Sequence, residues 1–250
     1  MRRPLRTGEA GGDAGLTSPS SPGPGAAAGA SGPPGGTPAG PDGLPQPRRA
    51  WSVVAISASI VVTVLDSSML GVALPGIARE LGISPASATW LLNAYQLTVV
   101  TTLLPLASLG ESIGFRRVFL FGFGLFALAS AGAALAAGSF EALLGFRILQ
   151  GLGASAVMSL TGGLIRHTYP ARQLGRAIGI NALVVAVSGA SAPTLAAAIL
   201  AVAPWPALFG VTVVPALVGM LIGARTLPRV PGTGRPFDAV SALLNIVTFG

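Results

Sequence analysis

Two charged residues, Asp66 and Arg147, lie within long apolar stretches of the sequence. A charge near the centre of a bilayer costs at least about 2.5–3.5 kcal/mol unless it is paired or hydrated. If both stretches are membrane-crossing helices, the two residues lie roughly 12 Å and 8 Å below the same boundary, at about 1.5 Å per residue. One ion pair or one water-filled cavity could hold both. A buried carboxylate beside an arginine can gain and lose a proton as its surroundings change, which proton-coupled transport requires.

Each of these charges also has a simpler explanation. Arg147 could extend to the membrane interface, and Asp66 could bond a nearby backbone amide. Gln150 follows Arg147 by one helical turn and would share its face. Three further polar residues of the stretch 89–109 could either line a cavity or bond between helices: Asn93, Tyr95 and Gln96.

A hinge that follows the second apolar stretch carries three charges. Gly110 and Gly114 permit a tight turn, and Glu111 lies close in sequence to Arg116 and Arg117. These residues could form a charge cluster on the cytoplasmic side. The alternative is a basic loop that only orients the protein in the membrane.

Other recognisable chemistry is absent from the sequence. Two stretches with the glycine spacing of a dinucleotide-binding loop, 122–127 and 151–156, lie in apolar segments with no preceding strand. No metal-ligand cluster, P-loop or nucleophile–base pair is visible, and we place the only histidine, His167, in a cytoplasmic loop. We therefore expect no enzyme activity, no metal and no cofactor, with a proton gradient as the energy source.

The composition of the 250-residue chain indicates a membrane protein. Charged residues make up 9% of it, against about 25% in ordinary soluble domains, and the mean hydropathy is +0.72. So little charge cannot cover a water-facing surface, which excludes a soluble enzyme. The lack of cysteine excludes a disulfide-stabilised secreted domain. The net charge of +7 comes from arginines scattered between apolar stretches, so we expect no nucleic-acid partner.

Apolar stretches of about 20 residues, enough for a helix to cross the hydrocarbon core, alternate with short polar hinges. The six predicted spans are 51–74, 89–109, 118–138, 142–164, 177–202 and 206–224. Small residues within them favour packing as one compact bundle. We expect a cytoplasmic loop at 225–238 and a seventh span that begins at 239 and is cut off at 250.

The first 48 residues differ from the rest of the sequence. They hold 12 glycines and 10 prolines and almost no large apolar side chains. Such a composition cannot bury enough surface to offset the entropy of ordering. We predict a disordered cytoplasmic arm, with a misplaced start codon as the alternative explanation.

The arginines also predict the orientation in the membrane. If the N-terminus is cytoplasmic, thirteen of the fifteen arginines lie on the cytoplasmic side, while Arg79 lies outside and Arg147 within a span. Cytoplasmic loops of membrane proteins carry such an excess of basic residues. We therefore expect a multi-pass protein of the bacterial inner membrane.

Several motifs in residues 51–250 resemble the major facilitator superfamily, specifically its fourteen-helix drug:proton antiporter branch. Residues 65–75, Leu-Asp-Ser-Ser-Met-Leu-Gly-Val-Ala-Leu-Pro, are similar to the Leu-Asp-x-Thr-Ile-Val-Asn-Val-Ala-Leu-Pro of that branch. Trp90 and Tyr95 fit its Trp-x-x-x-x-Tyr, and the hinge at 107–118 resembles the superfamily's Gly-x-Leu-x-Asp-Arg-x-Gly-Arg-Arg loop. The fourth-helix pattern Arg-x-x-Gln-Gly-x-Gly is matched by Arg147, Gln150, Gly151 and Gly153.

The resemblance implies the N-terminal six-helix half of a carrier that works by alternating access around a central cavity. It implies proton-driven export of amphipathic or cationic compounds, with Asp66 and Arg147 in proton or cation coupling. Pro193 would kink the fifth helix within an antiporter motif. The cytoplasmic conformational latch would consist of Gly110, Glu111, Gly114, Arg116 and Arg117. Partners would be the lipid bilayer, a small-molecule substrate and a C-terminal half or continuation of the same gene.

Three motifs depart from the family pattern, and in the first-helix motif the asparagine becomes Gly71. The hinge has Ala107 for the first glycine and Glu111 for the aspartate, and the fifth-helix Gly-Pro-x-x-Gly-Gly becomes Ala192-Pro193-Thr194-Leu195-Ala196-Ala197. Alanine methyl groups would block the close helix approach that paired glycines permit. Two alternatives to a drug exporter stay open, namely a metabolite uniporter or symporter of the same superfamily and a non-transporting fragment that lacks the second half.

Overall fold

The structure, a computed structural model, describes residues 44–229 and Gly232 of the chain. In this part, six helices are long and apolar enough to cross a membrane. They are α1 (Arg48–Glu80), α2 (Pro85–Ile113), α3 (Phe115–Leu135), α4 (Phe140–Thr168), α5 (Leu174–Leu200) and α6 (Ala207–Thr226), with a short 3-10 helix η1 (Ala171–Gln173) before α5.

The prediction of an all-α protein with six membrane-length helices is confirmed. The seventh span, expected at 239–250, lies outside the described residues. The arm expected at 1–48 and the loop expected at 225–238 lie mostly outside them as well.

Serine caps set the starts of two of the helices. Ser84 accepts a hydrogen bond from the backbone N–H of Ser87 at 3.0 Å, and Pro85 occupies the first helical position of α2. Ser139 accepts one from the backbone N–H of Ala142 at 3.2 Å at the start of α4. Both caps pair donors that a helix start leaves without an intrahelical partner.

The hinge expected at 109–117 is almost entirely helical, which corrects the expected loop conformation but not the predicted role of its basic residues in orienting the protein. α2 continues to Ile113 and α3 begins at Phe115, so Gly114 alone makes the turn. Its φ of 103° lies in a region that is strained for residues with a Cβ atom. A single glycine therefore reverses the chain.

His167 lies in the last turn of α4 and not in a loop, which is a second correction. Pro170 disfavours helical backbone at the preceding residue, and Tyr169 is extended with φ −101° and ψ 146°. The helix therefore runs on to Thr168, beyond the apolar run from which the span was predicted. The ring of His167 lies 5.8 Å from that of Phe115.

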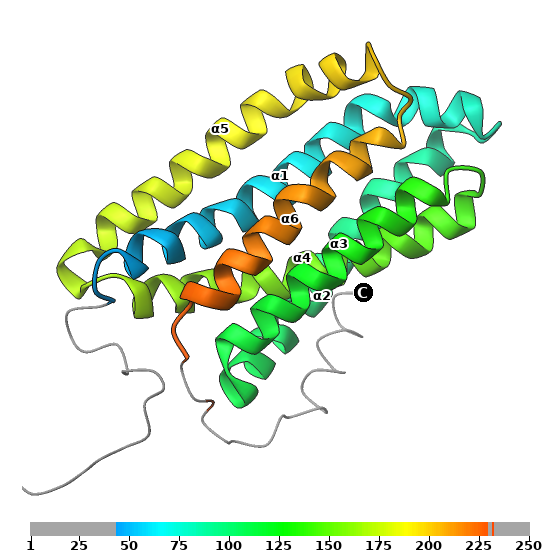
Figure 1. Ribbon diagram of the computed structural model, residues 1–250. Coiled ribbons are helices and arrows are strands. Elements are labelled where there is room, and N and C mark those ends of the chain that lie inside the picture. Colours follow the sequence, from blue (N-terminus) through cyan, green and yellow to red (C-terminus); the bar gives the residue numbers. More distant parts are fainter. Residues whose placement is uncertain (1–43, 230–231, 233–250) are drawn as a thin grey trace, which may run out of the picture. The chain divides into compact units, whose positions relative to one another are not determined.

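The helices pack as two groups of three (Figure 1). α4 packs against both α2 and α3, and α1 packs against both α5 and α6. Contacts between α3 and α6 join the groups, and α1 also contacts α2 and α4. The α1–α4 contact positions the candidate functional site, because Asp66 lies on α1 and Arg147 on α4.

Two apolar clusters form the core. The first includes Phe119, Phe123 and Leu160, and the second includes Leu70 and Phe209. Large apolar side chains also cover outward faces of the helices, for example Leu128, Leu183 and Val214. Such exposure is costly in water but expected where lipid is the solvent.

Candidate functional site

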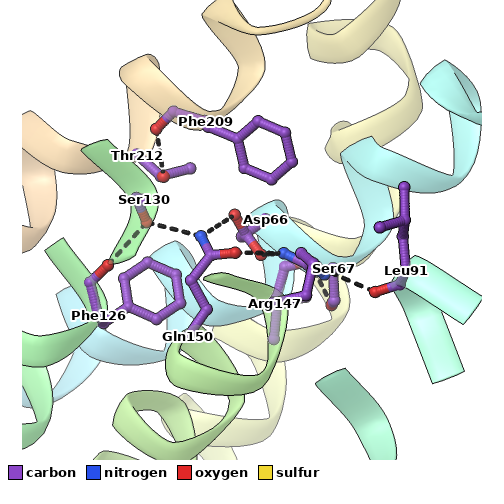
Figure 2. A network of polar contacts seen from close by, with 10 residues as sticks. Asp66, Ser67, Leu91, Phe126, Ser130, Arg147, Gln150, Phe209 and Thr212 are labelled. Carbon is purple, nitrogen blue, oxygen red and sulfur yellow. Dashed lines mark hydrogen bonds and ion pairs between the residues drawn. The ribbon is translucent and has the colours of Figure 1, made fainter. Parts of the chain in front are cut away.

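Asp66 and Arg147 form a buried ion pair between α1 and α4 (Figure 2). Arg147 Nη1 lies 2.5 Å from Asp66 Oδ2, and the two side chains are 0% and 2% exposed. The sequence left open whether the two residues form an ion pair, share a water-filled cavity or have no contact, and the structure shows the ion pair. Arg147 does not extend to the membrane interface.

Gln150 closes the polar network from the same face of α4 as Arg147. Its Oε1 accepts from Arg147 Nη1 at 2.8 Å, and its Nε2 donates to Asp66 Oδ1 at 3.2 Å. Both carboxylate oxygens of Asp66 therefore accept a hydrogen bond. This matches the sequence-based expectation that Gln150 shares the face of Arg147.

Ser130 of α3 is a member of the network that sequence reasoning missed. Its Oγ accepts from Gln150 Nε2 at 2.7 Å and donates to the backbone oxygen of Phe126 at 2.8 Å. In the sequence it resembles the other small residues of a helix rich in alanine and glycine. Only the packing of α3 against α4 distinguishes it.

Two aromatic rings and a backbone carbonyl complete the surroundings of Arg147. Its Nε donates to the carbonyl oxygen of Leu91 in α2 at 3.1 Å. The guanidinium carbon lies 4.5 Å from the ring centre of Tyr95 and 5.8 Å from that of Phe209. These are cation–π distances, and burial strengthens such contacts. Residues of four helices, α1, α2, α4 and α6, therefore contact the guanidinium of Arg147.

One donor of this arginine has no partner. Arg147 Nη2 is buried without a hydrogen bond among the described residues. An unpaired buried donor costs about 1–3 kcal/mol. Arg147 Nη2 can therefore donate to further hydrogen-bond acceptors, such as a water molecule or a polar group of a substrate.

The other residues expected to line a cavity divide into two sets. Tyr95 is buried and joins the network through its ring. Asn93 and Gln96 are exposed on α2 and take no part in the hydrogen bonds described around Arg147. The α-helical period separates them, because neighbouring residues face in different directions.

The residues expected to form the latch lie at the junction of α2 and α3. Gly110 is buried beside Leu160 of α4, and Gly114 makes the turn. Arg116 Nη2 donates to the carbonyl oxygen of Ala224 in α6. Glu111 and Arg117 are exposed. The structure therefore ties this hinge to α4 and α6.

Pro193 lies within α5, which continues through it to Leu200. The neighbouring Ala192 and Ala196 are fully buried in the second apolar cluster. Two of the three alanines that replace the family glycines therefore form part of the packing face of α5, whereas the third, Ala197, is exposed.

Replacing Ser130 with alanine removes one of the two acceptors of Gln150 Nε2. We expect the free energy of unfolding to fall by about 0.5–1.5 kcal/mol, as for the loss of an intramolecular hydrogen bond. The measurement is a denaturant titration in mixed micelles. Ser159→Ala is the control, because that hydroxyl donates to Ala156 within its own helix. Equal losses for the two variants would contradict a role of Ser130 in the network.

Comparisons with known proteins agree with this architecture. The model of the Major Facilitator Superfamily matches residues 56–247. The uncharacterized transporter YebQ of Escherichia coli (strain K12) is 43% identical over 213 residues, which cover 84% of this chain and 46% of that protein. The multidrug efflux pump LfrA of Mycolicibacterium smegmatis is 36% identical, over 81% of this chain and 40% of the pump.

Two further proteins widen the comparison. The riboflavin transporter RibZ of Clostridioides difficile is 30% identical, over 79% of this chain and 44% of that transporter. Among solved structures, the proton:xylose symporter XylE matches with a TM-score of 0.62 at 16% identity. That match covers 79% of this chain and 49% of the symporter, and it supports the fold alone.

The chain therefore spans less than half the length of these curated relatives. The family match nevertheless extends over most of the chain, covering α1 from residue 56 onward and the whole of the other five membrane-length helices. Together with the identity to YebQ, it shows that this multi-pass membrane protein belongs to the major facilitator superfamily.

Proposed function

We propose that the chain forms the N-terminal half of a proton-coupled exporter of amphipathic or cationic compounds. The exporter works by alternating access in the bacterial inner membrane, with the N-terminus in the cytoplasm. The observation that carries this proposal is the buried Asp66–Arg147 pair, which joins α1 to α4.

Protonation of Asp66 would change the energy of this contact. The carboxylate accepts hydrogen bonds from Arg147 and Gln150, and a neutral acid is a weaker acceptor than an anion. Arg147 would then keep a buried charge without its counter-ion, which is unstable unless the helices move or another anion enters. Proton binding is thereby coupled to the packing of α1 against α4.

A cationic substrate can use the same carboxylate. Such a cation competes with Arg147 and with the proton for Asp66, so binding of the substrate favours release of the proton. The aromatic rings of Tyr95 and Phe209 beside the site suit an amphipathic cation. The name of the relative LfrA, a multidrug efflux pump, supports the export of drugs.

A metabolite carrier is the second candidate, and the similarity to a riboflavin transporter supports it. In that case the unpaired Arg147 Nη2 would donate a hydrogen bond to an acceptor atom of a neutral or anionic solute. The direction of transport and the response to a protonophore distinguish the candidates. A symporter imports its solute with protons, whereas a uniporter does not respond to the protonophore.

The test is ethidium accumulation in a bacterium that lacks its own drug pumps. The complete reading frame that contains these residues should lower accumulation, and a protonophore should abolish the effect. Asp66→Asn should raise accumulation to the level of cells without the protein, because the amide cannot take up a proton at physiological pH. Glu141→Gln is the matched control, since that carboxylate is exposed at the start of α4, and it should export normally.

Three results would contradict this proposal. Accumulation could be unchanged although the protein is present in the membrane. Export could continue in the Asp66→Asn variant, or it could be lost equally in the Glu141→Gln control. The first would contradict drug export, and either of the other two would contradict the role proposed for the buried pair.

A further inference from the structure

Four arginines converge on a cavity at one end of the bundle, where α1 and α3 begin and α6 ends. The cavity has a volume of about 320 Å³. Its described lining residues are Arg48, Arg116, Ala224, Arg225, Leu227 and Arg229. None of these described residues carries a carboxylate, so their combined charge is strongly positive. We refer to it as the arginine cavity.

Two of these arginines are oriented by backbone carbonyls of α6. Arg48 Nε donates to the oxygen of Thr226 at 3.0 Å, and Arg116 Nη2 donates to the oxygen of Ala224. These bonds pair carbonyls that the end of a helix leaves without an intrahelical partner. A guanidinium has five N–H groups, so capping α6 leaves further donors on both residues.

Capping of α6 accounts for the placement of only two of the four arginines. Arg48 opens α1 and Arg116 lies in the first turn of α3, where the helix dipole disfavours a cation. The positive charges of Arg229 and Arg48 also repel that of the Arg116 guanidinium. The C-terminal end of α6 favours cations, but mutual repulsion and the starts of α1 and α3 oppose this arrangement, and a bound anion would relieve both of these unfavourable effects.

The outer face of α6 leads directly into the arginine cavity. Val214, Val218, Leu221 and Arg225 follow one another at intervals of four, three and four residues, which places them on one side of the helix. All three apolar side chains are exposed. An acyl chain could lie along this stripe while its headgroup reaches Arg225.

We propose that the arginine cavity binds the phosphate group of an anionic phospholipid. Guanidinium groups bind phosphate through paired hydrogen bonds, and basic pockets between membrane helices suit charged lipid headgroups. The starts of α1 and α3 add the positive ends of two helix dipoles. The apolar stripe of α6 supplies the second part of a lipid site, which free phosphate would not need.

The test is native mass spectrometry of the purified protein with phosphatidylglycerol, and with phosphatidylcholine as the zwitterionic comparison. We expect phosphatidylglycerol to be retained preferentially. The double variant Arg225→Gln/Arg229→Gln should bind it about tenfold more weakly, because each arginine near an anionic headgroup contributes to attraction. These two residues are exposed, so the variant should fold normally.

The matched control is Arg166→Gln/Arg172→Gln, which removes two exposed arginines outside the cavity lining. It should change phosphatidylglycerol binding less than twofold. Equal weakening by both double variants, or equal retention of phosphatidylcholine, would overturn the proposal. In a third arm, inorganic phosphate replaces the lipid in a thermal-shift measurement. The proposal is also overturned if inorganic phosphate stabilises the protein as much as phosphatidylglycerol does and this stabilisation is lost in Arg225→Gln/Arg229→Gln. That result would assign the cavity to free phosphate.

Discussion

Replacing Arg147 with methionine should lower the free energy of unfolding by about 3–5 kcal/mol, the cost typical of breaking a buried ion pair on one side. The substitution leaves the Asp66 carboxylate buried without its counter-ion. It also frees the carbonyl of Leu91 and the Oε1 of Gln150 from their bonds to the guanidinium. A denaturant titration of the purified protein in mixed micelles measures this loss.

The control for this prediction is Arg79→Met. Arg79 is exposed near the end of α1, and its Nε donates to Pro75 in the same helix. We expect a change within about 0.5 kcal/mol, as for most surface substitutions. The double variant Asp66→Asn/Arg147→Met should recover part of the loss, because no unpaired charge remains buried. A loss in Arg147→Met no larger than in Arg79→Met would contradict the role assigned to the pair.

Replacing Gly153 with alanine should be the second strongly destabilising change. A Cβ atom at this position would lie 2.7 Å from the backbone nitrogen of Phe126 and 2.8 Å from the carbonyl oxygen of Gly122. Both are backbone atoms of α3, so the helices would have to move apart. We expect a loss of about 1–3 kcal/mol, typical of overpacking a core, measured by the same titration.

Gly145 provides the control on the same helix. A Cβ atom there has nothing within 4 Å, and alanine favours helix over glycine by about 0.5–1 kcal/mol. Gly145→Ala should therefore leave stability unchanged or raise it. If both alanine variants were equally stable, the close approach of α3 and α4 at Gly153 would not limit the packing of the bundle.

Much of the architecture could be predicted from the sequence, because a membrane helix is a local feature. Its length is set by the thickness of the hydrocarbon core, and every backbone group must be paired within it. The sequence therefore determined the all-α class and the number of described membrane helices. It also singled out Asp66 and Arg147, since any charge in such a stretch is costly without a partner.

The tertiary structure alone decided which of the polar residues meet. Tyr95 and Gln96 are adjacent in α2, yet only Tyr95 is buried against Arg147. Ser130 joins the network and the arginine cavity forms only through contacts between helices distant in sequence. Such contacts depend on how each helix is rotated about its axis and on how closely its neighbours approach. Hydropathy determines where a helix crosses the membrane, but side-chain packing across helix interfaces determines which way it faces.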